Sequence, residues 1–201
     1  DPEALSASYL VHPLGETRVA GRQTDVVGII PRDNLRYGYR YYLDLESGLP
    51  LKSDLMGEQA EPIEQIMFTT LEFLSSGEAD PLPVPVESEP EPAPATRAAV
   101  VESDWGFDAL PPGFEPVVHD HWRDGDGRPV EHFVLSDGMA SVSVYVEGDA
   151  SEGLEGETRI GAVHAAGGRV AEHQVTVVGE VPAATVQAVL AGIRYREGAR
   201  P

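Results

Sequence analysis

Three histidines on two neighbouring predicted strands come closest to a metal-binding pattern. His119 and His121 lie two positions apart in a predicted strand over residues 114–122, so their side chains share one face of it. His132 lies in the next predicted strand, over residues 129–135. Imidazoles on adjacent strands could bind Zn²⁺, but the sequence leaves the register of the two strands open. Since imidazole is also ordinary on exposed strands, we expect a sheet-surface role and no metal.

A second segment has carboxylates at a spacing that resembles the start of a calcium-binding loop. Residues 123–128 read Arg-Asp-Gly-Asp-Gly-Arg, so Asp124 and Asp126 alternate with glycine. The complete loop needs a bidentate Glu at its twelfth position, and residue 135 is Leu. Asp126-Gly127 is instead typical of a tight hairpin turn. We therefore predict a turn here.

The other patterns that would indicate an enzyme are weak. Ser136-Asp137-Gly138 lies between two predicted strands and not at a strand-to-helix turn, so a serine-hydrolase nucleophile has no support. Residues 15–21 lack the glycine spacing and the following helix of a phosphate-binding loop. The absence of cysteine excludes disulfides, thiolate metal sites and cysteine catalysis. We expect a binding protein that is not an enzyme and needs no cofactor.

The chain is strongly acidic, with 34 acidic and 14 basic residues and a formal net charge of −20. Such a surface repels phosphate backbones, so we expect no nucleic-acid partner. No apolar run approaches the roughly 20 residues that span a bilayer. The sequence begins with Asp1-Pro2 and has no basic-then-apolar leader, so we expect a mature or truncated product.

Residues 36–55 form two strand-like runs joined by the turn Glu46-Ser47-Gly48. Because side chains alternate along a strand, the tyrosines of the first run share one face, and so do the leucines of the second. We find no candidate helix in residues 1–75 to cover this face, so it is either a core with a missing layer or a ligand groove. The residues predicted to contact an apolar ligand are Tyr39, Tyr41, Leu51, Leu55, Met67 and Leu71.

The composition divides the chain into two strand-rich blocks. Residues 1–75 form the first, an antiparallel meander with one apolar face. Residues 76–104 contain six prolines between Pro81 and Pro94, interleaved with glutamates, and are predicted to be an extended, exposed linker. The strands expected in the first block are residues 7–12, 17–19, 24–30, 37–45, 49–55 and 63–73.

Residues 105–201 are predicted to form a small α+β domain of about five strands and a helix. Glycine-containing pairs suggest hairpin turns at Asp126-Gly127, Asp137-Gly138 and Gly167-Gly168. After Pro182, apolar residues from Val186 to Ile193 recur at helical spacing, which predicts a short helix over the apolar face of the sheet. The strands expected are residues 114–122, 129–135, 140–147, 158–165 and 170–178.

Several segments, in their order and spacing, resemble one known family. In the first block they are Gly-Glu-Thr-Arg-Val-Ala-Gly-Arg at 15–22, Val-Val-Gly-Ile-Ile-Pro-Arg-Asp at 26–33 and Arg-Tyr-Gly-Tyr-Arg at 36–40. In the second they are Leu-Pro-Pro-Gly-Phe at 110–114 and Ser-Asp-Gly-Met-Ala-Ser-Val-Ser-Val-Tyr-Val at 136–146. Together they are similar to the MucB/RseB family of periplasmic regulators of the envelope-stress sigma factor.

The resemblance implies a fold that is mostly β. The N-terminal domain of the family is similar to periplasmic lipoprotein carriers, which are open antiparallel half-barrels with helices against the concave face. Family members carry about another hundred residues upstream, so the resemblance implies that residues 1–75 are the back half of such a half-barrel. It also implies that residues 105–201 form a small antiparallel sheet domain with a C-terminal helix.

The resemblance also implies a function. It is to bind the periplasmic segment of a single-span anti-sigma factor and shield it from proteolysis, while lipopolysaccharide or lipoprotein acyl chains relieve the block. We expect the protein in the periplasm, with partner contacts around Trp122 and Tyr145. A lipid or lipoprotein carrier without a regulatory partner is the alternative, and a homo-oligomer is left open.

Overall fold

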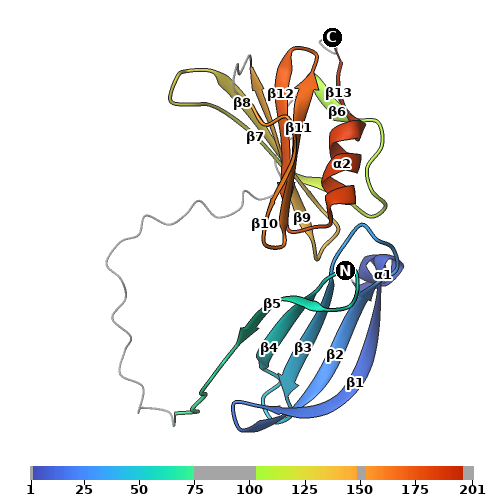
Figure 1. Ribbon diagram of the computed structural model, residues 1–201, viewed down its shortest axis with the longest axis vertical. Helices are drawn as coiled ribbons and strands as arrows, with labels where there is room; N and C mark the ends of the chain where they lie inside the picture. The colour runs from blue at the N-terminus through green and yellow to red at the C-terminus, as the bar shows by residue number, and fades with distance from the viewer. Residues whose placement is uncertain (1, 75–102, 149–152, 197–201) are drawn as a thin grey trace.

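A computed structural model describes residues 2–74, 103–148 and 153–196 of the chain (Figure 1). We call residues 2–74 the first unit and the other two ranges the second unit. The predicted linker, residues 76–104, lies outside the described residues except for Ser103 and Asp104. These two residues are half-buried: the Ser103 hydroxyl donates to Glu131 over 2.6 Å, and the Asp104 carbonyl accepts from the Arg196 amide over 2.6 Å. No helix in the described ranges is long and apolar enough to cross a membrane.

The first unit is an open antiparallel sheet in which neighbouring strands follow one another along the chain, in the order β1-β2-β3-β4-β5. The predicted meander is therefore confirmed. A short helix precedes the sheet and lies at the end nearest the second unit (Figure 1). The elements are α1 (Pro2–Ser8), β1 (Tyr9–Val19), β2 (Arg22–Pro31), β3 (Gly38–Asp44), β4 (Pro50–Met56) and β5 (Pro62–Met67).

Three expectations for the first unit were wrong. Residues 7 and 8 end a helix, which is too short to reveal a helical period in the sequence. The two strands expected over 7–12 and 17–19 form one strand, because the register shift between Pro13 and Gly15 accommodates an extra residue without ending the pairing. The last strand ends at Met67 and does not reach residue 73.

The second unit contains a six-stranded antiparallel sheet in the order β10-β11-β12-β9-β8-β7. The predicted hairpins at Asp126-Gly127 and Asp137-Gly138 are confirmed, and the predicted helix packs against β11 and β12. Two short strands that the sequence did not indicate, β6 and β13, pair with each other. The elements are β6 (Trp105–Phe107), β7 (Glu115–Arg123), β8 (Pro129–Ser136), β9 (Ser141–Gly148), β10 (Gly156–Ile160), β11 (Val163–Val170), β12 (His173–Gly179), α2 (Ala183–Gly192) and β13 (Ile193–Tyr195).

The hairpin expected at Gly167-Gly168 was wrong, because both glycines lie inside β11. The neighbouring turns instead use Gly161 before this strand, with φ of 60°, and Ala171 and Glu172 after it, with φ of 47° and 66°. The absence of a side chain at Gly167 has a different structural reason. A Cβ atom there would lie 2.2 Å from the carbonyl oxygen of Leu154, so the glycine permits a close approach of two backbone segments.

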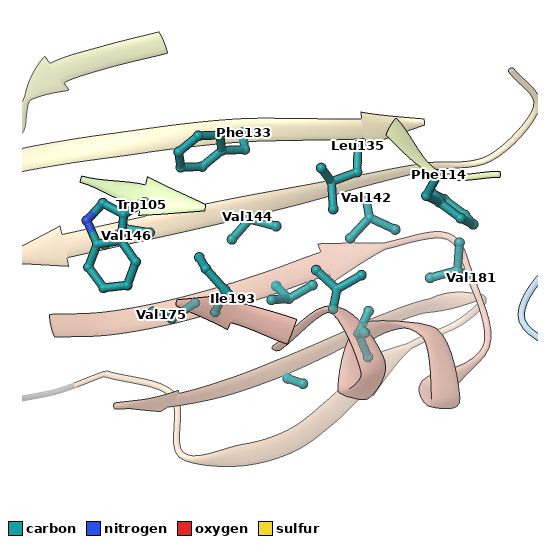
Figure 2. Packing of buried hydrophobic residues seen from close by; sticks show 14 of the residues in the cluster. Trp105, Phe114, Phe133, Leu135, Val142, Val144, Val146, Val175, Val181 and Ile193 are labelled. Atoms are coloured by element: carbon teal, nitrogen blue, oxygen red, sulfur yellow. The ribbon is translucent and has the colours of Figure 1, made fainter. Parts of the chain in front are cut away.

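The core of the second unit lies between the six-stranded sheet and a layer made of α2, β6 and β13 (Figure 2). Val142, Val144 and Val146 of β9 point into it, as their alternation predicted. Val186 and Val189 of α2 are fully buried against them. The buried residues form one cluster, so this unit has a continuous core of its own. Burial of each valine side chain contributes about 1.5–3 kcal/mol to folding.

Candidate functional site

The first candidate surface is one side of the first sheet, which we call the tyrosine face. The rings of Tyr39 and Tyr41 stack with centroids 6.0 Å apart and planes 9° from parallel. Across the neighbouring strand, Tyr39 is opposite Ile29 and Tyr41 is opposite Val27. Residues directly opposite each other in an antiparallel pair share a face, so these four side chains form one apolar stripe.

The tyrosine face reaches both edges of the sheet through residues that the sequence reasoning missed. Val11 of β1 is opposite Ile29, and Ile66 of β5 is opposite Ser53, which is itself opposite Tyr41. Both aliphatic side chains are largely exposed. Alternation within β1 and within β5 indicated which side chains share a face of each strand. The register that brings Val11 and Ile66 to the same face as the tyrosines cannot be predicted from either strand alone.

The predicted ligand-binding residues separate into groups. Leu51 and Leu55 are buried, so they belong to the core of the first unit and of its junction with the second. Leu71 is half-buried in the segment after β5. Met67 does not share the tyrosine face: it is opposite Lys52, which is opposite Tyr42 on the reverse side. Met67 was grouped with the wrong face because β5 pairs with β4 in the register that puts Ile66 opposite Ser53, and the sequence of β5 alone does not determine this register.

The reverse side of the first sheet carries a polar network around Asp54, whose side chain is buried. Tyr42 donates to its Oδ2 over 2.9 Å, Gln65 donates to its Oδ1 over 2.8 Å, and Lys52 lies 3.1 Å from Oδ1. Burial alone would raise the pKa of this carboxyl. The hydrogen bonds from Lys52, Tyr42 and Gln65 outweigh burial and hold the pKa below its usual value. The two sides of the sheet are therefore chemically different.

The second candidate surface lies on the side of the six-stranded sheet that faces away from the core. We call it the aromatic patch, and it consists of Trp122 of β7, His132 of β8 and Tyr145 of β9. His132 and Tyr145 stack with centroids 4.4 Å apart, and Trp122 lies edge-on to both at 5.9 and 6.4 Å. The structure thus brings together Trp122 and Tyr145, the two residues predicted to contact a partner, and adds His132.

The register of β7 and β8 overturns the alternative of a three-histidine zinc site. His132 is opposite Asp120, whereas His119 and His121 are opposite Phe133 and Glu131 on the other side of the sheet. His119 stacks on the Phe133 ring and has Nε2 3.0 Å from a Glu131 carboxylate oxygen. Among the described residues, no group of three or more His, Cys, Asp or Glu side chains could hold a metal ion.

His132 is the unusual member of the aromatic patch. Its Nε2 atom is buried and has no hydrogen-bond partner among the described residues. Burial lowers the pKa of this imidazole, and the nearby Asp120 carboxylate opposes that shift only in part. This shift favours the neutral form of the ring that stacks on Tyr145.

Comparison with known proteins assigns the family. The MucB/RseB N-terminal domain model matches residues 1–90, and the MucB/RseB C-terminal domain model matches residues 99–194. The structure is similar to that of MucB in complex with MucA(peri), with a TM-score of 0.78 and 33% identity, covering 98% of this chain and 71% of that chain. The chain belongs to the MucB/RseB family. The fold expected from the sequence, mostly β with open antiparallel sheets and a C-terminal helix, is confirmed.

Two further comparisons give the similarity of this MucB/RseB chain to MucB. It is 34% identical to the sigma factor AlgU regulatory protein MucB of Pseudomonas aeruginosa, over 100% of this chain and 65% of the relative. The chain therefore spans less than two thirds of the length of that protein. The crystal structure of MucB gives a TM-score of 0.66 at 32% identity, covering 97% of this chain and 66% of that chain.

Proposed function

We propose that this protein binds the periplasmic segment of a membrane anti-sigma factor and so regulates an envelope-stress sigma factor. The observation that carries the proposal is the similarity of both units together to MucB in complex with MucA(peri). The match covers 98% of this chain, so it extends over both units. The proposal also places the protein in the periplasm and gives it no catalytic step.

Protection by occupancy is the mechanism that fits a binding protein of this kind. A segment held in one conformation against a folded surface cannot enter a protease active site, which needs an extended and accessible chain. A competing ligand can relieve the protection only if its affinities for the free and the partner-bound states differ. The regulator thus needs two separate surfaces, one for the partner and one for the signal.

The aromatic patch is the proposed partner surface. Trp122 is 43% exposed and lies on β7, an edge strand of the sheet among the described residues. An edge strand presents unpaired backbone groups that can bind an extended segment, and exposed tryptophan and tyrosine commonly dominate binding energy. Tyr145, stacked on His132, would form the floor beside Trp122.

The tyrosine face is the proposed signal surface. Its stripe of tyrosine, valine and isoleucine side chains fits acyl chains, such as those of lipopolysaccharide or a lipoprotein. These exposed apolar side chains also favour the second candidate function, a lipid or lipoprotein carrier without a regulatory partner. The two functions differ in whether the protein binds a segment of an anti-sigma factor.

Binding of the purified protein to the periplasmic segment of the MucA-type anti-sigma factor of the same organism tests the proposal. We expect saturable binding in isothermal titration calorimetry and slower cleavage of the bound segment by an added protease. The matched control is a scrambled segment of equal composition and charge. Binding of a fluorescent acyl probe without binding of the segment would favour the carrier function and contradict the regulatory one.

A further inference from the structure

A buried ion pair joins the two units of the protein. Arg36 lies between β2 and β3 in the first unit, and Asp137 lies in the turn between β8 and β9 in the second. The Arg36 Nη1 atom donates to Asp137 Oδ2 over 2.8 Å, and both side chains are 0% exposed. The Arg36 Nη2 atom also donates to the carbonyl of Pro112 over 2.5 Å. One side chain of the first unit thus holds two separate segments of the second.

Aromatic rings from both units enclose this pair. The Arg36 guanidinium lies 5.5 Å from the centre of the Tyr9 ring and 5.2 Å from that of Phe114. The Tyr9 hydroxyl donates to Asp137 Oδ2 over 3.0 Å. When one partner of an ion pair removed from water in this way is lost, the other remains as an unpaired buried charge. Breaking the pair is therefore strongly unfavourable.

The two oxygens of Asp137 have different tasks. Oδ1 accepts from the backbone amides of Met139 and Ala140 and so fixes the turn between β8 and β9. Oδ2 accepts from Arg36 and Tyr9 of the first unit. An asparagine could keep the first task through its carbonyl oxygen but would present an amide where Oδ2 accepts. The contact between the units can therefore be removed without removing the turn.

The residues on either side of Arg36 also contact the second unit. The carbonyl of Leu35 accepts a hydrogen bond from the Thr185 hydroxyl at the start of α2. The Tyr37 hydroxyl lies 3.3 Å from His164 Nδ1, and the Tyr37 ring packs with Leu55 and with Ala162 of the second unit. Three consecutive residues, Leu35 to Tyr37, thus dock the first unit onto the second.

Electrostatic repulsion opposes this contact elsewhere in the same junction. The Glu180 side chain of the second unit is exposed, and partial loss of its surrounding water together with the Glu64 carboxylate of the first unit raises the pKa of its carboxyl. In a chain of net charge −20, like charges on the two units repel each other. The pairing of the Arg36 guanidinium with Asp137 acts against this repulsion.

The structure of this chain is more similar to one solved structure of a relative than to another. At almost equal coverage of this chain, 98% and 97%, the TM-score is 0.78 for MucB in complex with MucA(peri) and 0.66 for the crystal structure of MucB. We propose that Arg36, through Asp137, is a positioning residue that locks the two units in the arrangement competent for partner binding. This inference rests on the proposed function for its consequence, but the lock itself is a property of the unbound protein.

The test measures the distance between the units. The chain has no cysteine, so spin labels can be placed at exposed Glu16 of β1 and Ala188 of α2 through two cysteine substitutions. The variants are Arg36→Met and Asp137→Asn in this labelled background. Arg18→Met is the matched control, because exposed Arg18 bonds to Gln23 and Gly21 within the β1–β2 hairpin. Backbone amide NMR spectra establish that each sheet keeps its fold.

We expect one narrow distance distribution in the parent and in Arg18→Met, and a broad distribution in Arg36→Met and Asp137→Asn. If only about a tenth of the molecules stay in the competent arrangement, binding of the anti-sigma segment weakens about tenfold. Unchanged narrow distributions in both variants, with folded sheets, would overturn the lock. A broad distribution with unchanged affinity would overturn its link to binding. Failure of the parent to bind the segment would refute the proposed function, while the distances would still decide on the lock.

Discussion

The His132 ring lies parallel to the Tyr145 ring, with centroids 4.4 Å apart and planes within 6°. Trp122 stands nearly perpendicular to both. Three neighbouring strands each contribute one of these rings, so the rings hold one another in place without help from a loop. A rigid aromatic surface loses little conformational entropy when it binds, which makes the aromatic patch a suitable anchor for a partner segment.

Replacing Trp122 with alanine should weaken binding of the anti-sigma segment while leaving the fold intact. Trp122 is 43% exposed, so its removal should cost stability little, whereas loss of a tryptophan anchor typically costs about 2 kcal/mol of binding free energy. Calorimetric titration measures the change in Kd. Val117→Ala on the same strand is the control, since Val117 is similarly exposed but lies outside the aromatic patch. Equal effects of the two substitutions would contradict the assignment.

His132 should make the stability of the second unit depend on pH. Burial lowers the pKa of this imidazole below its ordinary value of 6.5, with the Asp120 carboxylate acting against the shift. The unfolded chain therefore takes up a proton at a higher pH than the folded chain does. The contribution to stability is present above the unfolded pKa and is lost as the pH falls through the folded pKa.

We accordingly expect the urea midpoint of the protein to fall as the pH is lowered from about 7.5 to about 5.5, and this fall should be smaller in His132→Gln. Trp122 and Tyr145 face the ring from β7 and β9, and Asp120 is the charged group opposite it. His121→Gln is the control, because His121 is exposed and lies on the other face of β7 from His132. An identical pH dependence in parent and His132→Gln would rule out this residue as the source.

The sequence predicted those features that alternation or turn chemistry determines locally. The buried valines of β9, the turn at Asp126-Gly127 and the helix after Pro182 all follow from patterns within a few residues. Register does not, because it depends on bulges and on the pairing of strands. That is why His132 was grouped with His119.

The contact of Arg36 with Asp137 was also beyond sequence reasoning, for a different reason. These residues lie 101 positions apart, and each has a sufficient local explanation. Asp137 is a turn residue in front of a glycine, and Arg36 follows a cluster of polar turn residues. Nothing in the local pattern of either one indicates that its side chain is fully buried against the other unit.

Two adjacent residues of β5 offer a matched test of the tyrosine face. Ile66 is on that face and 73% exposed, whereas Met67 is on the reverse side and 58% exposed. Ile66→Glu should reduce binding of a fluorescent fatty-acyl probe several-fold, because a charge would lie in the path of the acyl chain. Met67→Glu should leave binding unchanged. Since both positions are exposed, stability should change by less than about 0.5 kcal/mol in either variant. The reverse ranking would place the ligand on the other side of the sheet.

Gly167 and Gly168 of β11 should respond differently to the same substitution. A Cβ atom at Gly167 would meet the Leu154 carbonyl oxygen at 2.2 Å, whereas at Gly168 the nearest atom is Leu190 Cδ2, at an ordinary 3.8 Å. Gly167→Ala must displace residue 154, which also accepts a hydrogen bond from the Gln174 amide over 2.7 Å, so we expect a loss of about 1–3 kcal/mol. Gly168→Ala should be neutral or slightly stabilising, because alanine restricts the unfolded chain more than glycine does. Urea unfolding of the two variants measures both values. A hairpin turn at these residues would make both substitutions costly, so a difference confined to Gly167 distinguishes close packing from a turn.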